Sequence, residues 1–259
     1  MTHSLALSVL VRTFNEADRI ERTLRSAAKL GGELVVIDAG STDATVEIAR
    51  RCGANVYANP WPGFGPQRFF GEGKCGFDWV FSLDADEVLP DALIAEIRAA
   101  MAEPNPPRLM IVRKASILPG HDRPPPLAFC HAQILIYDRR IARTGPNPNW
   151  DRLEISAPDA PRKLPTPLWH YSLRDLSHAI SKALYVGKLA ADTQPVRSLA
   201  GLTARMIVEF PIAFVRYYIG RRFFLAGADG LLFAWVGAYS RFIRIALMRE
   251  RALRERGHP

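Results

Sequence analysis

Short apolar runs alternate with longer amphipathic stretches over the first part of the chain. The apolar runs are rich in Val, Ile and Leu, as buried strands are, and lie at residues 5–12, 33–38 and 78–83, with a shorter one at 54–58. Stretches with helical spacing of apolar residues lie at residues 16–30, 44–52 and 91–101. Strands that alternate with helices form parallel sheets covered by helices. The pattern predicts an α/β fold with a mostly parallel sheet flanked by helices.

The pattern is less regular in the middle of the chain. Two further strands are predicted at residues 108–113 and 132–138, separated by a proline-rich loop. Residues 59–73 hold so many Pro and Gly residues that they cannot be regular structure throughout. We therefore expect residues 1–172 to form one domain with an irregular second half.

From residue 173 to residue 259 the pattern is helical. An amphipathic helix is predicted at 176–192, and two apolar stretches follow at 199–219 and 223–247. Charged residues interrupt both stretches before they reach the roughly 20 apolar residues of a bilayer span. Helices that lie in the membrane interface are the favoured interpretation. A helical hairpin packed on the domain or on another subunit is the alternative.

The net charge of +8 supports this division of the chain. Eleven arginines and only four acidic residues lie between residues 197 and 256, so this segment carries +7 of the total. A nucleic-acid-binding protein that is basic throughout would distribute its charge differently. A basic, apolar tail suits an anionic membrane surface.

The cysteines and the N-terminus favour the cytoplasm. Cys52, Cys75 and Cys130 are odd in number and show no CxxC spacing, so neither a disulfide framework nor a zinc site is predicted. The N-terminal apolar run lacks a basic leader and a cleavage site, so it is interpreted as a first strand and not as a signal peptide.

Polar clusters follow three of the predicted strands, at residues 13–16, 38–43 and 84–87. Ligands of open α/β sheets bind beyond the carboxyl ends of the strands. Helix capping is the alternative explanation for any one cluster, but three in succession favour a ligand site. In the third cluster, Asp84 and Asp86 lie one residue apart after a buried strand, where both carboxylates can reach one divalent cation. Oxygen ligands of this kind suit Mg²⁺ or Mn²⁺, which also bind substrate phosphates.

Three segments, LSVLVRTFNEADRIERTL, ELVVIDAGSTDATVEIARRCGANV and DWVFSLDADEVLPDALIAEI, resemble the nucleotide-sugar domain of the family 2 inverting glycosyltransferases. The subgroup that they resemble most adds glucose in β-1,4 linkage to the lipopolysaccharide core. The similarity runs from about Leu5 to Ile97 and more thinly to His170. It implies a GT-A-type, Rossmann-like catalytic domain over residues 1–172. The helical extension of residues 173–259 would then associate with a membrane or form oligomers.

The resemblance also implies roles for individual residues. Its nucleotide-sugar pocket would comprise Thr13, Asn15, Glu16, Asp38, Gly40, Ser41, Asp84 and Ala85. Arg68 matches a basic position near the donor diphosphate, although a surface arginine on a loop is the alternative. Asp86 would hold the metal with Asp84 and with His170, for which a buried core histidine is the alternative.

An inverting transferase also needs a carboxylate that takes the proton of the attacking hydroxyl. The family often supplies this base from a His-Glu pair, and the corresponding residues here are Trp150 and Asp151. Asp151 is therefore the expected base, with Glu154 as the next candidate. Because the aspartate side chain is shorter, the acceptor has to approach it more closely.

The resulting hypothesis is a metal-dependent, inverting hexosyltransferase of cell-envelope or lipopolysaccharide biosynthesis. Its donor would be a nucleotide-sugar, UDP-glucose by family analogy, and its acceptor a lipid-linked saccharide at the cytoplasmic face of the inner membrane. The alternative is a catalytically degenerate scaffold that binds nucleotide-sugar at the membrane. A sugar nucleotidyltransferase is disfavoured, since no Gly-rich phosphate loop follows the first strand.

Overall fold

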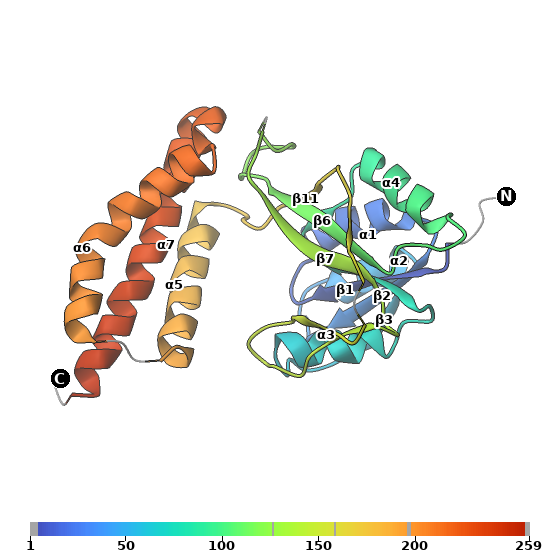
Figure 1. The fold of residues 1–259 in the computed structure, drawn as a ribbon, viewed down its shortest axis with the longest axis horizontal. Coiled ribbons are helices and arrows are strands. Elements are labelled where there is room, and N and C mark those ends of the chain that lie inside the picture. The colour runs from blue at the N-terminus through green and yellow to red at the C-terminus, as the bar shows by residue number, and fades with distance from the viewer. Residues whose placement is uncertain (1–4, 126, 158, 196–197, 257–259) are drawn as a thin grey trace. The chain divides into compact units, whose positions relative to one another are not determined.

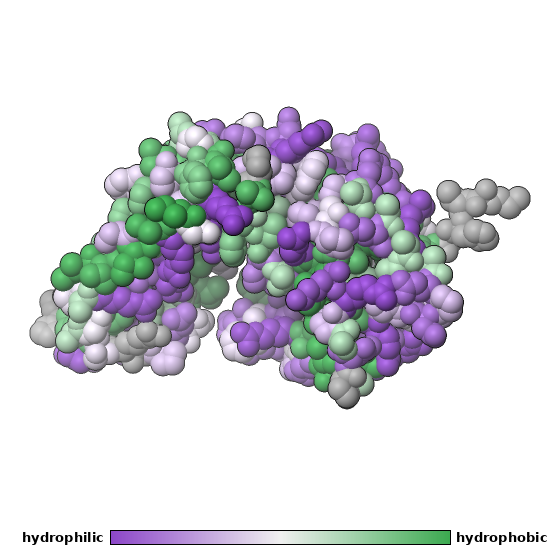
Figure 2. Space-filling model, turned by 45° about the horizontal axis from the view of Figure 1, so that its top comes forward, coloured by the Kyte–Doolittle hydropathy of each residue, from purple (hydrophilic) through white to green (hydrophobic). Residues whose placement is uncertain are grey.

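The structure, a computed structural model, describes residues 5–125, 127–157, 159–195 and 198–256. The chain folds into two compact units, an α/β unit and a helical unit (Figure 1). The α/β unit takes the chain up to Ala115 and again from Cys130 to His170. The helical unit takes Ser116–Phe129 and the chain from Tyr171 onward. Figure 2 shows broad hydrophobic areas on the surface of the helical unit.

The α/β unit is built on a mixed sheet in the order β3-β2-β1-β4-β7-β6-β11-β5, with β10 paired to β6. Strands β8 and β9 form a separate two-stranded sheet. The strand bounds are β1 Leu7–Thr13, β2 Glu33–Asp38, β3 Asn55–Ala58, β4 Trp79–Asp84, β5 Glu87–Val88, β6 Leu109–Ser116, β7 Cys130–Asp138, β8 Ala142–Thr144, β9 Leu153–Ile155, β10 Arg162–Lys163 and β11 Leu168–His170.

The first half of this sheet is parallel, as the strand-helix alternation predicts, and β10 also pairs in parallel with β6. β1 pairs in parallel with both β2 and β4, and β2 pairs in parallel with β3. β7 then runs antiparallel to both β4 and β6. The sheet as a whole is therefore mixed: its parallel half follows the strand-helix alternation, and the described residues between β6 and β7 form no helix that would return the chain for a parallel pairing.

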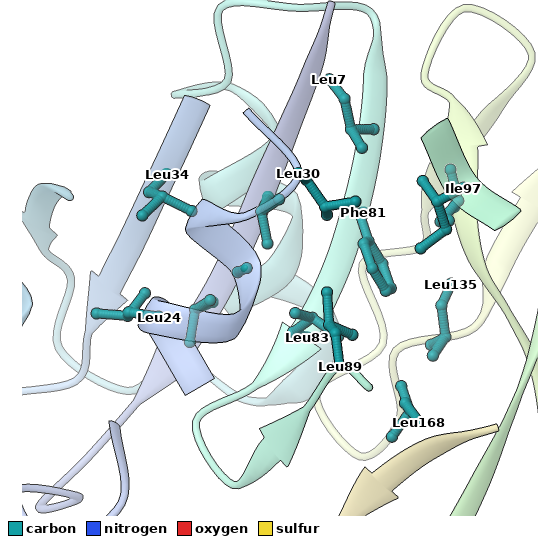
Figure 3. Packing of buried hydrophobic residues seen from close by; sticks show 14 of the residues in the cluster. Leu7, Leu24, Leu30, Leu34, Phe81, Leu83, Leu89, Ile97, Leu135 and Leu168 are labelled. Atoms are coloured by element: carbon teal, nitrogen blue, oxygen red, sulfur yellow. The ribbon is translucent and has the colours of Figure 1, made fainter. Parts of the chain in front are cut away.

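Four helices cover the two faces of the sheet: α1 Ile20–Ala28, α2 Thr45–Arg51, α3 Phe64–Glu72 and α4 Asp91–Met101. On one face, Leu24 of α1 and Ile97 of α4 pack with Phe81 and Leu83 of β4 (Figure 3). On the other face, α3 covers β1 and β2 so closely that a Cβ at Gly71 would lie 2.6 Å from a methyl group of Leu10. Burial of each large apolar side chain contributes about 1.5–3 kcal/mol, so these two layers hold the sheet in place.

Helix α3 is the main departure from the predicted elements, because the Pro- and Gly-rich stretch 59–73 contains it. Gly63 has a φ of 112°, which L-residues rarely adopt, and it turns the chain into the helix. Pro66 lies in the first turn, where its missing N–H would have no intrahelical partner. Arg68 therefore lies on a helix, 5 % exposed, and not on a surface loop.

The helical unit consists of α5 Leu176–Thr193, α6 Leu199–Val215, a π-turn η1 at Arg216–Gly220, a 3₁₀ turn η2 at Phe223–Ala226 and α7 Gly227–Arg254. Helices α5 and α6 both pack against α7. Asp175 caps α5 by accepting a bond from the backbone N–H of His178, and Ser198 caps α6 in the same way. Between α6 and α7, the carboxylate of Glu209 accepts from Arg205 and Arg241 at 2.9 and 2.8 Å.

The described part of the helical unit also bears on the membrane prediction. By length and composition alone, the stretch Phe223–Arg254 is apolar enough to cross a bilayer. The sequence pattern disfavoured spans because charged residues interrupt both apolar stretches. The stretch Phe223–Arg254 nevertheless contains a long apolar segment, because its charged residues cluster toward its C-terminal end.

Candidate functional site

The site is built at the carboxyl ends of β1, β2 and β4. The parallel register places Thr13 beside Asp38, and Arg12 beside Asp84. The three polar clusters that follow these strands therefore meet at one edge of the sheet, as the sequence pattern predicts. Each strand is almost wholly buried, so the strand ends are held rigidly by the core.

The loops after β1 and β2 are tied together by side chains expected to bind the nucleotide. The carboxylate of Asp38, 4 % exposed, accepts bonds from the backbone N–H groups of Gly40 and Ser41, both at 2.9 Å. The hydroxyl of Ser41 in turn accepts from the backbone N–H of Asn15 at 2.8 Å. Asn15 itself adopts a φ of 52° and accepts a bond from the N–H of Thr42. These contacts bring Asn15, Asp38, Gly40 and Ser41 into one pre-organised loop pair.

The remaining residues of this group lie around the same strand ends. Thr13 is buried, and its backbone carbonyl accepts from the N–H of Ala39. Glu16 forms an ion pair with Arg19 at 2.5 Å, and its backbone N–H donates to Thr45. Ala85 is buried, and its carbonyl accepts from the hydroxyl of Thr23 on α1, which anchors the turn between Asp84 and Asp86.

Asp84 is paired with two cationic side chains. Its carboxylate lies 2.6 Å from Nη2 of Arg12 and 3.7 Å from Nζ of Lys114. Burial alone would raise the pKa of Asp84, but Arg12 and Lys114 hold it well below the usual range of a carboxyl group. Asp84 is therefore a carboxylate whose charge is already balanced by the protein.

Lys114, on β6, lies between Asp84 and the fully buried Glu87, with which it forms a close ion pair. Burial raises the pKa of Glu87 against the opposing effect of Lys114. Burial also acts to lower the pKa of Lys114, but Glu87 and Asp84 overcome it and raise this pKa. Glu87 also accepts the backbone N–H of Asp84 at 3.0 Å, so it fixes the turn that carries both aspartates.

Asp86 faces a different partner, His170 on β11. The antiparallel pairing of β11 with β5 sets His170 beside Glu87, and Nε2 of His170 lies 3.4 Å from Oδ2 of Asp86. Arg19 lies 3.7 Å from the same oxygen. Burial opposes ionisation of both groups, but their mutual contact lowers the pKa of Asp86 and raises that of His170.

The expected metal ligands are therefore only partly brought together. In the part of the chain that the structure describes, no group of three or more His, Cys, Asp or Glu side chains is arranged to hold a metal ion. Asp84 points to Arg12 and Lys114, whereas Asp86 and His170 adjoin. Oδ1 of Asp86 is buried and has no hydrogen-bond partner among the described residues. A buried, unpaired carboxylate oxygen beside an imidazole suits a divalent cation, so Asp86 and His170 fit such an ion.

Asp151 joins the same cluster from the opposite side. Its carboxylate lies 2.8 Å from Nη1 of Arg12 and 3.5 Å from Nη1 of Arg68. Arg12 thus links Asp84 with Asp151, the expected base. The backbone N–H groups of Phe64 and Gly65, at the start of α3, donate to the carbonyls of Pro148 and Asn147. These bonds hold the loop that carries Asp151 against the helix that carries Arg68.

Glu154 and Trp150 lie apart from these contacts. Glu154 is exposed on β9, and no contact among the described residues joins it to Asp84, Asp86 or Arg12. Trp150 is 50 % exposed, and the guanidinium of Arg152 lies 5.7 Å from its ring. An exposed indole beside Asp151 leaves its face open for stacking.

Four charged residues of the site were not singled out from sequence: Arg12, Arg19, Glu87 and Lys114. Arg12 and Lys114 could have been recognised from the sequence, because each is a charged residue within an apolar strand. A charge in such a place is costly unless a partner of opposite sign is present. Arg19 and Glu87 lie within the recognised segments but look like ordinary helix and turn residues.

Comparison with known proteins gives a consistent result. Residues 8–151 match the model of the family described as Glycosyl transferase family 2. An uncharacterized glycosyltransferase of Rickettsia bellii is 32 % identical over 257 residues, which cover 95 % of this chain and 87 % of that protein. The lipopolysaccharide core biosynthesis glycosyltransferase LpsC of Rhizobium meliloti is 25 % identical, over 97 % of this chain and 94 % of LpsC.

Two solved structures are similar at lower levels. S. aureus TarS, in complex with UDP-GlcNAc, has a TM-score of 0.45 and 15 % identity over 97 % of this chain and 92 % of that one. Glucosyl-3-phosphoglycerate synthase from Mycobacterium tuberculosis, in complex with Mn²⁺ and UDP, has a TM-score of 0.35 and 25 % identity. That alignment covers 43 % of this chain and 44 % of the synthase.

Proposed function

The chain belongs to glycosyl transferase family 2, and on this premise we propose that it transfers a hexose from a UDP-sugar, UDP-glucose by preference, to a lipid-linked saccharide with inversion at the anomeric carbon. The observation that carries this proposal is the meeting of Asp84, Asp86 and Asp151 at the carboxyl edge of the sheet. The similarity to a lipopolysaccharide core enzyme supports the class of acceptor.

In this proposal the donor nucleotide binds at the loops after β1 and β2. Thr13, Asn15, Glu16, Asp38, Gly40 and Ser41 would line the base and ribose, with Asp84 and Ala85 nearer to the diphosphate. Carboxylates and amides accept bonds from base N–H groups and ribose hydroxyls. Arg68 is buried and keeps Nε and Nη2 without hydrogen-bond partners among the described residues, so it has donors to spare for a phosphate.

Asp86 and His170 would hold Mg²⁺ or Mn²⁺, with Asp84 adjoining. When bound, such an ion neutralises charge that develops on the departing diphosphate. Arg68, Arg12 and Lys114 add fixed positive charge around the same centre, so the chain itself also favours an anionic leaving group.

Asp151 would take the proton from the acceptor hydroxyl as that oxygen attacks the anomeric carbon. The bond from the sugar to the diphosphate breaks in the same displacement, which inverts the anomeric configuration. The ion pairs with Arg12 and Arg68 hold the carboxylate of Asp151 in one orientation. Both arginines contact Oδ2, so the acceptor hydroxyl would have to reach the other carboxylate oxygen.

The helical unit would associate with the cytoplasmic face of the membrane that carries the acceptor. Its exposed apolar side chains and its arginines support this part of the proposal. Sedimentation of the purified protein with vesicles of anionic and of neutral lipid tests it. Full recovery of the protein in the supernatant with both kinds of vesicle would contradict membrane association.

The donor and metal assignments are tested by replacing Asp86 with Asn. We expect release of UDP from UDP-glucose with Mn²⁺ and acceptor to fall at least about a hundredfold, since even loss of a ligand's supporting partner costs 10–100-fold. Asp159→Asn, at an exposed aspartate of the same unit, serves as control. Equal turnover in the two variants would refute the metal role. Donor binding without turnover of any UDP-hexose by the unmodified protein would favour the scaffold.

A further inference from the structure

The helical unit contains a pocket of about 260 Å³ that none of the proposed catalytic steps uses. Its lining comes mainly from α5 and α7, and residues of η1, of η2 and of the segment 116–118 also contribute to it. Its lining is mainly apolar and includes Ile117, Leu118, Ala183, Val186, Phe233 and Val236. The volume lies just below the roughly 300–1,000 Å³ of sites for drug-sized ligands, which suits a single flexible chain.

The charged groups of this pocket are all positive. Lys182 of α5 and Arg221 both line it, and no acidic residue does so among the described residues. Nζ of Lys182 donates to the carbonyl of Ser172 at 3.1 Å, which draws the ammonium group toward the start of α5. The guanidinium of Arg221 lies 4.4 Å from the ring centre of Tyr217, so aromatic stacking holds it in place.

A smaller hollow adjoins the same end. It shares Ser116, Leu118, Arg221 and Phe223 with the pocket and extends to Phe129. Arg221 also lies 4.8 Å from the ring centre of Phe129. Arg221 therefore stands at the junction of two hollows, where a group at the end of a buried chain can reach it.

From these observations we propose that the pocket binds one anionic lipid. An acyl chain lies between α5 and α7, and the negatively charged headgroup lies against Lys182 and Arg221. An uncharged ligand would leave the two cations without a counter-charge in a mainly apolar pocket, whereas a phosphate accepts bonds from both. A cationic headgroup is excluded, because no acidic residue lines the described part of the pocket.

The surface of the helical unit supports a lipid as the occupant. Side chains exposed by 53–74 % on α6, η1 and α7 include Ile207, Ile212, Val215, Ile219 and Trp235. Val186, at the pocket itself, is 45 % exposed. Hydrophobic areas on this unit (Figure 2), together with its many arginines, suit contact with a membrane, from which a lipid chain would enter the pocket.

The pocket is also close in sequence to the proposed catalytic centre. Ser116 follows Lys114 by two residues, and Ser172 follows His170 by two. The lipid site does not depend on the proposed transfer reaction, but a lipid bound here is held by the chain segments that carry two residues of that centre.

Binding of a single-chain probe tests the proposal directly. Dodecyl phosphate, titrated calorimetrically into the full-length protein below its micelle concentration, is expected to bind one per chain. Dodecyl maltoside, which lacks the charge, and inorganic phosphate, which lacks the chain, should each bind at least about tenfold more weakly. Equal affinity for dodecyl phosphate and dodecyl maltoside would overturn the role of the cations.

Two substitutions in the lining and one control outside it, all at exposed positions, locate the site. Lys182→Ala should weaken dodecyl phosphate binding about tenfold, whereas Lys188→Ala, six residues further along α5 and outside the lining, should not change it. Val186→Trp places a bulky ring at the pocket and should block the chain. Circular dichroism checks that each variant is folded. Equal binding by folded Lys182→Ala, Lys188→Ala and Val186→Trp would overturn the proposal.

The source of the lipid is distinguished by two further measurements on Lys182→Ala. If the lipid belongs to the acceptor, KM rises for the lipid-linked saccharide and not for the same saccharide without its lipid. If the lipid is a bilayer phospholipid, both KM values stay unchanged and sedimentation with anionic vesicles falls. If the protein binds dodecyl phosphate but transfers no sugar, the proposed function fails and the lipid site stands. If it transfers sugar but does not bind dodecyl phosphate, the lipid site fails and the proposed function stands.

Discussion

At the scale of single residues, Arg12 holds the site together. It lies next to the last residue of the buried strand β1 and contacts Asp84 and Asp151 from one guanidinium group. Burial would lower the pKa of Arg12, but these two carboxylates raise it above its ordinary value, so the side chain is always charged. A planar, forked cation can bridge two carboxylates in a way that lysine, a point charge, cannot.

Replacing Arg12 by Gln should therefore impair both stability and catalysis. We expect a loss of about 3 kcal/mol in the free energy of unfolding, because two carboxylates lose a common partner in a partly buried site. Transfer should fall at least about tenfold. Urea unfolding and donor turnover measure the two effects. Arg108→Gln removes an ion pair to Asp138 elsewhere in the same unit, and equal losses in both variants would contradict the special role of Arg12.

Cysteine reactivity gives a second test at this scale. Burial raises the pKa of the Cys75 thiol to about 12, and its sulfur donates to the carbonyl of Gly71. At pH 8 only roughly one thiol in ten thousand is then ionised. Iodoacetamide should label the partly exposed Cys52 and Cys130 first, and Cys75 only after denaturation, as peptide mass spectrometry would show. Labelling of Cys75 in the folded protein at the rate of Cys130 would argue against the packing of α3.

At the scale of elements, α3 couples the sheet to the loop that carries Asp151. A Cβ at Gly65 would lie 2.4 Å from the backbone oxygens of both Gly145 and Asn147. Backbone atoms cannot move aside as a flexible side chain can. Gly65 is therefore required by this close approach.

Gly65→Ala should push the loop away from α3 and separate Asp151 from Arg68. We expect a loss of about 1–3 kcal/mol in stability, as in other overpacked sites, and a larger proportional loss of transfer activity. Gly73→Ala, at the end of the same helix and with an ordinary φ of −69°, is the matched control. Wild-type activity in a stably folded Gly65→Ala protein would contradict this coupling.

The elements also show how far the sequence predicts the structure. The strands that end at Thr13, Asp38 and Asp84 were predicted to within one or two residues, because continuous apolar runs bounded by polar turns are unambiguous. Helix α3 was missed, since Pro and Gly at the start of a helix look the same in sequence as Pro and Gly in a loop. The α/β fold and the family resemblance are confirmed.

The site was predictable only in part, for a related reason. Asp84 and Asp86 can be recognised in the sequence because they lie at the end of a predicted strand. Lys114 and His170 lie on β6 and β11, far from them in the sequence. Their approach depends on antiparallel register, which spacing along the chain does not reveal. The roles of Asp151 and Glu154 stay predictions, although only Asp151 contacts the other charged groups of the site.

At the scale of the whole molecule, one buried carboxylate stabilises the helical unit. Glu209 is 6 % exposed and joins α6 to α7 through Arg205 and Arg241. Burial would raise its pKa, but hydrogen bonds from Arg241 and Arg205 lower this pKa below the ordinary value. Its stabilising contribution is thus present above the ordinary glutamate pKa of about 4.3 and is lost as the pH falls through the lowered value.

Glu209→Gln should accordingly destabilise the helical unit at pH 7 and have little effect near pH 3, where the unmodified carboxylate is also losing its charge. Urea unfolding followed by helical circular dichroism at the two pH values measures the difference. Glu250→Gln removes an exposed pair with Arg254 and should be nearly neutral at both pH values. A pH-independent effect of Glu209→Gln would rule out the charge as its cause.

The path of the chain has a consequence for how this protein can be divided. Ser116–Phe129 leaves the α/β unit between β6 and β7, and Leu118 packs with Ala179 and Phe233 in the helical unit. Cutting the gene after His170 would strip this inserted segment of its apolar partners and leave it as an exposed, aggregation-prone loop. A chimera that borrows the helices of a relative must therefore exchange two stretches of sequence together. Recombination that moves only the C-terminal stretch should therefore yield insoluble proteins.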